Sequence, residues 1–286
     1  MKIALFGGSG FIGSHVKRVL RLQDHELTIV LRDKFNETDD DFCANYITGH
    51  KVVLNFSGAS LLKKWTESYR RELYNSRILT TRKIATAILR ASDPPVLFIN
   101  ASAVSIYNDH GKHTENSVEY ADTFLSNLCR DWESEANKVS GRCRVVNLRM
   151  GLVLAKDGGV LTKMAPFFRL GIGARVGSGT QGLSWIHIDD LLEIILFVMR
   201  QEKIDGIVNA VGEYPTDNYN FSDSLGKMFR QPVYFSIPRF AMKMIFGDIS
   251  QVLINGQKVI PAKLQAHGFT FKYPTIDKAL IGIYRD

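Results

Sequence analysis

The segment MKIALFGGSGFIG, residues 1–13, decides the fold of this chain. A short apolar run leads into Gly7, Gly8, Gly10 and Gly13, and a helical pattern follows. Gly7 and Gly8 permit turn dihedrals that are closed to other residues. Gly10 lets a pyrophosphate approach the backbone, and Gly13 lets the helix pack closely on the strand. Because the positive end of the helix dipole would face the phosphates, this strand, turn and helix predict a dinucleotide-binding site.

Strand-like and helix-like segments alternate from this turn through about residue 210. The expected strands are Ile3–Phe6, Glu26–Leu31, Val52–Phe56, Val96–Ala101 and Arg144–Leu148, and the expected helices are Phe11–Leu22, Glu67–Ala91 and Ala121–Lys138. Such alternation predicts an α/β fold, a doubly wound parallel sheet of the Rossmann type with its ligand crevice at the carboxyl ends of the strands. We expect residues 1–230 to form this domain, with elements from about residue 150 closing the crevice. Residues 231–286 are expected to form a small α+β C-terminal lobe.

The end of the second expected strand bears on which dinucleotide binds. An acidic residue there would bind the ribose 2′-hydroxyl of NAD, and this chain has Arg32, Asp33 and Lys34. The Arg32 guanidinium favours a 2′-phosphate through charge-assisted hydrogen bonds. Asp33 keeps NAD(H) open, and a solvated charge cluster is the plainer alternative. On electrostatic grounds the sequence favours NADP(H) over NAD(H).

Charge and cysteine content narrow the classes of partner and compartment. The net charge is +7, but the basic residues are scattered, so we expect a general bias toward anionic ligands and no nucleic-acid partner. Cys43, Cys129 and Cys143 form no CxxC pair, and an odd number argues against a disulfide framework. A reducing cytoplasm or organelle matrix fits, and we expect a cytoplasmic protein.

The sequence predicts neither a membrane segment nor a metal site. The apolar stretch 191–199 is far below the roughly 20 residues that a membrane span needs, and it is typical of a buried helix. The apolar run at residue 3 is too short for a signal peptide. His110 and His113 have metal-like spacing, but they lie in a polar stretch without a partner cluster.

Seven stretches carry a resemblance to a known family. They are GGSGFIG (7–13), LNFSGAS (54–60), WTESYRRELYNSRILTT (65–81), ASAVSIY (101–107), LRMGLVL (148–154), SGTQGLSWIHIDD (178–190) and NGQKVIPAKLQAHGFTFKYP (255–274). With these motifs the chain resembles the short-chain dehydrogenase/reductase superfamily in its extended, epimerase-like form. It looks like the atypical branch described as NAD-dependent epimerase family proteins, whose small C-terminal segment has no known role.

The resemblance implies cofactor contacts that match positions of this chain. These are Gly7, Ser9, Gly10, Phe11, Ile12, Gly13, Arg32, Phe56, Ser57, Glu72, Arg77 and, near the nicotinamide, Leu152. The residues themselves support part of this set. Asn55 to Gly58 end a buried strand beside the first, so their backbone is expected to border the ribose, and Gly58 permits close approach. Arg77 lies at helical spacing from Leu73, which would point a cation at the crevice, with a surface ion pair as the alternative.

The catalytic pair of the superfamily is where this chain departs from the resemblance. Those enzymes typically use a Tyr with a Lys four residues later on a helix, and the lysine lowers the pKa of the phenol. None of the 10 tyrosines here has Lys at the fourth position after it. Leu125 stands in the tyrosine place and Cys129 in the lysine place, and neither can perform that proton transfer.

Three other residues are candidates for supplying the proton. Tyr107 is the best surviving phenol, and a packing residue at the rim of the sheet is its plainer role. Ser102 follows a strand close to the superfamily's substrate-binding serine and would also border the cofactor, although an ungapped count places Ala103 there. His187 is the third candidate, with a hydrogen-bonded core histidine as the alternative.

Two functions remain open from the sequence. In the first, an NADP(H)-dependent, epimerase-like oxidoreductase moves a hydride to or from an unknown small carbonyl or sugar-like substrate. In the second, the protein binds NADP(H) without turnover and acts as a sensor or scaffold, through a protein partner or as a homodimer. Gln257 and Lys258 are expected to roof the crevice, and Lys258 is the basic group considered for a substrate carboxylate or phosphate, with a surface lysine as the default.

Overall fold

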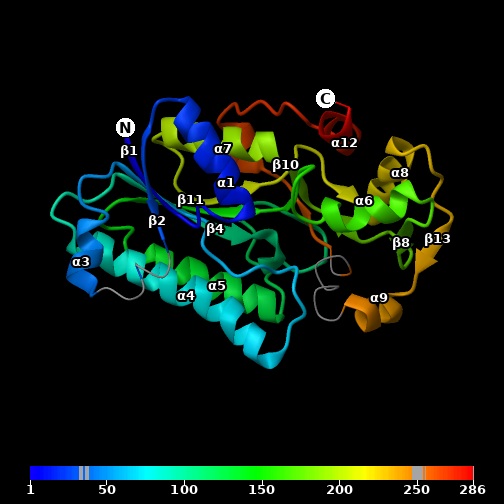
Figure 1. Cartoon of the computed structure of the whole chain (residues 1–286), viewed down its shortest axis with the longest axis horizontal. Coiled ribbons are helices and arrows are strands. Elements are labelled where there is room, and N and C mark those ends of the chain that lie inside the picture. The colour runs from blue at the N-terminus through cyan, green and yellow to red at the C-terminus, as the bar shows by residue number, and fades with distance from the viewer. Residues whose placement is uncertain (32–34, 36–38, 247–253, 255, 286) are drawn as a thin grey trace.

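A six-stranded parallel sheet forms the centre of the computed structural model, which describes residues 1–31, 35, 39–246, 254 and 256–285 (Figure 1). Its strands are β1 (Lys2–Phe6), β2 (Glu26–Val30), β3 (Val52–Asn55), β4 (Leu97–Ala103), β6 (Arg144–Met150) and β11 (Gly206–Ala210), in the spatial order β11-β6-β4-β3-β1-β2. The order reverses direction between β1 and β3, so the crevice at their carboxyl ends is the topological switch point. This confirms the doubly wound, Rossmann-like fold that the sequence predicts.

Helices cover both faces of the sheet, because β1 alternates its buried side chains between two apolar cores. Ile3 and Leu5 pack into the core that contains Val16 and Leu191, whereas Ala4 and Phe6 pack into the other. The first face carries α1 (Phe11–Leu22), α7 (Ile188–Arg200) and α11 (Ala262–Ala266), and the second carries α3 (Asp40–Asn45), α4 (Glu67–Arg90) and α5 (Phe124–Asn137). Figure 1 shows α1 and α7 above the sheet and α3, α4 and α5 below it.

A third apolar core lies beyond the sheet, around the buried Trp185. It joins residues of three helices, among them Leu161, Phe221 and Leu280. The elements of this region are α6 (Leu161–Arg169), α8 (Asn218–Met228), α9 (Arg239–Phe246) and α12 (Ile276–Tyr284), with the strand pairs β7 (Leu152–Leu154) and β10 (Trp185–His187), β8 (Ala174–Val176) and β13 (Phe235–Ile237), and β9 (Gly182–Leu183) and β12 (Thr216–Asp217). The last part of the chain returns to the first domain, since β14 (Lys258–Val259) pairs with β5 (Lys112–His113). The expected lobe boundary at residue 230 stays a prediction.

Helix α7 carries the apolar stretch that the sequence assigns to a buried helix. It has 13 residues, and its Leu191 and Ile194 side chains are fully buried in the first core. In the described part of the chain, no helix combines the length and the apolar content that crossing a membrane requires.

Candidate functional site

The glycine turn between β1 and α1 leaves no room for a side chain at Gly7 or Gly13. Gly7 has a φ of +78°, and a Cβ on it would lie 2.5 Å from the carbonyl carbon of Phe56, at the end of β3. A Cβ on Gly13 would lie 2.1 Å from the carbonyl oxygen of Gly7. Both distances are far below contact, so only glycine permits this approach of helix, turn and neighbouring strand.

The N-terminus of α1 is built to receive an anion. Its N-cap is Gly10, which has no side chain to bond the first N–H groups, and the first turn contains no acidic residue. Ser9 and Gly10 are exposed, and Phe11 and Ile12 are half-buried behind them. The helix dipole and these N–H groups therefore present partial positive charge to a ligand at the switch point. Together with the glycine cradle, this geometry fits the diphosphate of a dinucleotide.

The segment after β3 borders the same crevice through its backbone. The side chain of Asn55 points inward, where Nδ2 donates to Thr81 Oγ1 and Asn100 Oδ1, each at 2.8 Å. Its Oδ1 accepts the N–H of Ser57 at 3.1 Å and so fixes the turn. Asn55 thus fixes the conformation of the loop that carries Phe56, Ser57 and Gly58. The backbone of this loop, and not the side chain of Asn55, borders the crevice.

Helix α4 places Arg77 against this loop. The Arg77 side chain is buried, and it donates from Nη1 to Leu73 O and from Nη2 to Ala59 O, both at 3.1 Å. Gly58 leaves room for it, since a Cβ there would lie 2.9 Å from Arg77 Cζ. Burial lowers the pKa of Arg77. The guanidinium thus lies behind the loop, bonded to backbone carbonyls, and Glu72 is exposed on the same helix. The expected contacts of Arg77 and Glu72 with the cofactor stay predictions.

The residue on which the choice between NADP(H) and NAD(H) depends is not among the described residues. Arg32, with Asp33 and Lys34, lies outside the described residues, directly after the end of β2. Its expected contact with a 2′-phosphate stays a prediction from the sequence.

A cavity of about 420 Å³ opens at the carboxyl ends of β4 and β6. It is lined by Leu61, Ala103, Val104, Ser105, Asn108, Asp109, His110, Tyr120, Ala121, Asp122, Thr123, Leu125, Met150, Gly151, Leu152, Val153, Gly182, Leu183, Ser184, Gly256 and Gln257. Leu152 and Gln257 are both lining residues, and the carbonyl of Gln257 accepts from the lining Ser184 at 2.8 Å. The expected position of Leu152 near the nicotinamide stays a prediction. Lys258 is exposed and is not part of the lining. The volume suits a small-molecule site.

The face of α5 that would carry the tyrosine and lysine presents Leu125, Cys129 and Glu133 instead. All three are buried, and their spacing of four places them on one side of the helix. Cys129 Sγ lies 3.9 Å from Ser105 Oγ, and burial raises the pKa of its thiol to about 11. The thiol is therefore protonated at neutral pH.

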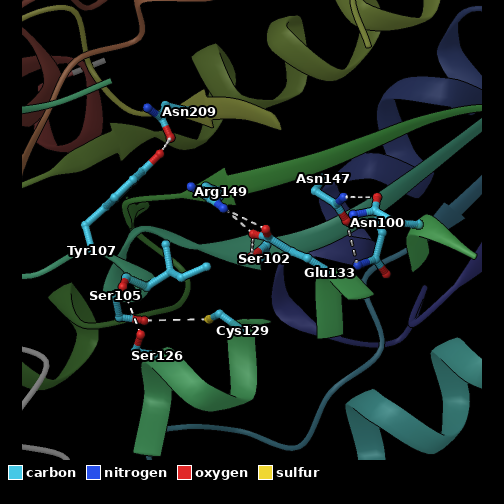
Figure 2. Close-up of polar contacts among 12 residues, drawn as sticks. Asn100, Ser102, Ser105, Tyr107, Ser126, Cys129, Glu133, Asn147, Arg149 and Asn209 are labelled. Carbon is cyan, nitrogen blue, oxygen red and sulfur yellow. Dashed lines mark hydrogen bonds and ion pairs between the residues drawn. The ribbon is translucent and has the colours of Figure 1, made fainter. Parts of the chain in front are cut away.

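Ser102 donates a hydrogen bond to a buried ion pair between Glu133 and Arg149. Arg149 binds both carboxylate oxygens of Glu133, through Nε at 2.8 Å and Nη2 at 2.7 Å, and Ser102 Oγ donates to Glu133 Oε1 at 2.5 Å. Figure 2 shows the three side chains converging between β4, β6 and α5. The Ser102 hydroxyl is committed to this network and is not part of the cavity lining.

Tyr107 is buried on the far side of Arg149, whose guanidinium lies 4.9 Å from its ring centroid (Figure 2). Its hydroxyl is 3.0 Å from both Thr114 O and Asn209 Oδ1, and burial raises the pKa of the phenol. The His113 ring stacks on it with centroids 4.9 Å apart. This is the geometry of a packing residue. Within the described ranges, no group of three potential metal ligands forms around His113 or elsewhere.

His187 lies apart from the other two candidates. It is the N-cap of α7, with Nδ1 accepting the N–H of Asp189 at 3.0 Å, and its ring lies 3.8 Å from that of Tyr273. The structure therefore links Ser102 and Tyr107 through Arg149 but does not bring His187 to them, and none of the three lines the cavity. Their catalytic roles stay predictions.

Sequence reasoning missed Tyr120, a polar residue that lines the cavity and also lies beside Arg149. Tyr120 lines the cavity, and the Arg149 guanidinium lies 5.5 Å from its ring centroid. Tyr120 reaches this place through an antiparallel bridge with Tyr107. No motif marks the loop that carries it, so spacing along the sequence offers no signal for it.

Family models match almost the whole chain. The model described as the NAD dependent epimerase/dehydratase family matches residues 3–211. A second, described as a domain of unknown function, DUF1731, matches residues 237–282.

Curated relatives agree with this match. The chain is 32% identical to the "Epimerase family protein SDR39U1 homolog, chloroplastic" of Arabidopsis thaliana over 99% of this chain and 86% of that protein. It is 33% identical to the epimerase family protein ML0860 of Mycobacterium leprae over 97% of this chain and 94% of that protein.

Solved structures extend the likeness to three dimensions. The human epimerase family protein SDR39U1, crystallised with NADPH, is 30% identical with a TM-score of 0.91, and the match covers 100% of both chains. A nucleoside-diphosphate sugar epimerase from Corynebacterium glutamicum is 26% identical with a TM-score of 0.80, covering 99% of this chain and 58% of that one. The UDP-glucuronic acid 4-epimerase of Bacillus cereus with NAD, at 15% identity and a TM-score of 0.76, shares the fold, and covers 100% of this chain and 98% of its own.

Proposed function

We propose, from the premise that this chain belongs to the NAD-dependent epimerase/dehydratase family, that it binds NADP(H) at the switch point and acts on a small carbonyl or sugar-like substrate in the adjoining cavity. The observation that carries the proposal is the cradle of Gly7 and Gly13 beneath the uncapped N-terminus of α1. The human relative that binds NADPH matches this chain over its whole length, which supports the choice of nucleotide.

The residues of this chain would hold the cofactor in four places. The α1 N-terminus binds the diphosphate, and the backbone of Phe56 to Gly58 borders the ribose, backed by Arg77. Leu152 lies on the cavity wall where the nicotinamide is expected. Arg32 would bind the 2′-phosphate.

Reduction of a carbonyl also needs a proton, and Tyr120 is our candidate for its source. When bound, NADPH would supply a hydride to the carbonyl carbon. The carbonyl oxygen then takes a proton from a group in the cavity, and the Tyr120 phenol lines it. The Arg149 guanidinium lies 5.5 Å from the centroid of the Tyr120 ring and would help to hold the ring in place.

A second function, an NADP(H)-binding sensor or scaffold without turnover, is favoured by one observation. The face of α5 that carries the proton relay in the superfamily presents Leu125 and a thiol whose pKa is about 11. Both functions share the nucleotide site. The three cysteines, all within the described residues, are buried and form no disulfide. This supports a reducing compartment, and we propose the cytoplasm for either function.

Titration of the purified protein with NADPH, NADP, NADH and NAD, read by calorimetry, tests the shared premise. We expect submicromolar NADPH binding, weakened about tenfold or more by Arg32→Ala while NADH binding changes little. Gly13→Ala is expected to abolish binding, because its Cβ would collide with Gly7 O. Gly141→Ala is the matched control, since a Cβ at Gly141 meets nothing within 4 Å.

Weak binding of all four nucleotides by the unaltered protein would overturn both functions. Binding with consumption of NADPH in the presence of aldehydes or ketones supports the enzyme, and binding without consumption of NADPH across such a panel supports the sensor.

A further inference from the structure

The charges around the cavity indicate which substrates it admits, and the inference rests on the proposed function for the cavity's role. Two carboxylates, Asp109 and Asp122, are among its lining residues, together with His110. Of the residues that the structure describes, no lysine or arginine lines it. The lining therefore has a negative or neutral character, against the net charge of +7 for the chain.

Two cations adjoin lining residues in the sequence, and one of them is paired while the other is exposed. Arg149 is buried, and its guanidinium is bound at both ends of the Glu133 carboxylate. Lys258 follows the lining residue Gln257, but it is exposed in β14, where its stem packs against Gly182. Neither supplies a positive charge to an anion inside the cavity.

Helix α5 begins at the cavity, and its positive end is also unavailable to an anionic ligand. The lining includes Asp122 and Thr123, which immediately precede the first helical residue. The Thr123 side chain caps the helix by accepting the N–H of Ser126 at 3.2 Å. Asp122, which directly precedes this N-cap, adds a negative charge near the same end of the helix.

We propose that the cavity admits uncharged or cationic carbonyl compounds and excludes nucleoside-diphosphate sugars and other anionic substrates. A diphosphate needs cationic side chains or unoccupied N–H groups to replace its water, and this lining offers it two carboxylates instead. Part of the wall is apolar, since Leu125, Leu152 and Leu183 are among the lining residues. Such a wall binds a ring or an alkyl chain by burial of apolar surface.

Charged thiol reagents of matched size test the sign of the electrostatic potential inside the cavity directly. A cysteine is introduced at the lining position as Ser105→Cys, and its reaction is timed with the trimethylammonium-ethyl and the sulfonato-ethyl methanethiosulfonates. After correction for the rates with β-mercaptoethanol, we expect the cationic reagent to react about tenfold or more faster. The unaltered chain, whose cysteines are buried, gives the background. Leu61→Cys provides a second lining position if the first variant does not fold.

When Asp109→Asn and Asp122→Asn are added to the Ser105→Cys variant, we expect the rate ratio of the cationic to the anionic reagent to fall to about twofold or less. Adding Lys258→Ala instead should leave that ratio unchanged. Equal or faster reaction of the anionic reagent in the parent variant would overturn the proposal. The measurement is made without nucleotide, so failure of NADPH to bind would refute the proposed function and leave this result readable. In the NADPH-loaded protein, saturable binding of UDP-glucose below about 1 mM would also overturn it.

Discussion

At the scale of single residues, two tyrosines joined by one β-bridge have different surroundings. Tyr107 is fully buried, with its hydroxyl between Thr114 O and Asn209. Tyr120 is half-buried and lines the cavity. Both rings contact the Arg149 guanidinium, which is fixed by Glu133. The first arrangement suits structural support and the second suits contact with a substrate.

Substituting each tyrosine by phenylalanine separates these roles. We expect Tyr107→Phe to lower the free energy of unfolding by about 1–3 kcal/mol, because buried acceptors lose their donor. Tyr120→Phe should change it by less than about 1 kcal/mol. Urea unfolding followed by circular dichroism gives both values, with Tyr120→Phe serving as the control for the loss of a phenol.

If NADPH-dependent carbonyl reduction is found, we expect the change at Tyr120, which has the smaller effect on stability, to have the larger effect on kcat. Tyr120→Phe is expected to lower kcat by about 100-fold or more, since general acid catalysis contributes that much. A full kcat in Tyr120→Phe would remove this residue from the mechanism.

At the scale of elements, one buried carboxylate fastens the C-terminal part of the chain to helix α7. Asp190 accepts the backbone N–H groups of Lys272 at 2.8 Å and Tyr273 at 3.0 Å. Burial raises the pKa of Asp190, and these two hydrogen bonds act against that rise. The neighbouring Asp189 is 41% exposed and only approaches Lys272 Nζ, at 3.6 Å.

Removing this carboxylate should loosen the segment that leads into α12. We expect Asp190→Ala to cost about 2 kcal/mol or more in unfolding free energy, because two N–H groups lose their acceptor. Hydrogen exchange at Lys272 and Tyr273 should accelerate in that variant. Asp189→Ala is the control, with an expected change within about 0.5 kcal/mol. Equal effects of the two substitutions would contradict the assigned tether.

At the scale of the whole molecule, the third core connects the end of the chain to the strands beside the cavity. Leu280 of α12 is fully buried in a cluster that also contains Leu154 of β7 and Trp185 of β10. Those two strands pair with each other, and β7 carries the lining residue Leu152. The wall of the cavity therefore depends on packing by the last helix.

Shortening one core side chain should accordingly destabilise the protein as a unit. Leu280→Ala is expected to lower the unfolding free energy by about 2–5 kcal/mol, through lost burial and the cavity left behind. Circular dichroism and tryptophan fluorescence should report the same single transition. Ile281→Ala, at a position on the same helix that is 41% exposed, should change little. Two separate transitions in Leu280→Ala would indicate that this region unfolds independently.

The sequence by itself determined the features that depend on local geometry. Gly7 and Gly13 mark the turn because the positive φ of Gly7 is a local property, and the clash that a Cβ on Gly13 would make is with Gly7 itself. The alternation of apolar runs and helical patterns likewise predicts the parallel sheet, because each pattern reports which faces must be buried. The absence of the Tyr–Lys pair was also readable, as a matter of spacing along α5.

Only the tertiary structure decided what each polar side chain does. Glu133 lies outside the seven quoted stretches, Arg149 lies within LRMGLVL (148–154), and no motif joins the two. Their ion pair nevertheless binds the Ser102 hydroxyl, which does not line the cavity. The same guanidinium separates the buried Tyr107 from Tyr120 at the cavity. A buried charge must find a partner wherever the fold brings one, and hydrogen bonds are assigned by distances in space. Spacing along the chain carries no record of those distances.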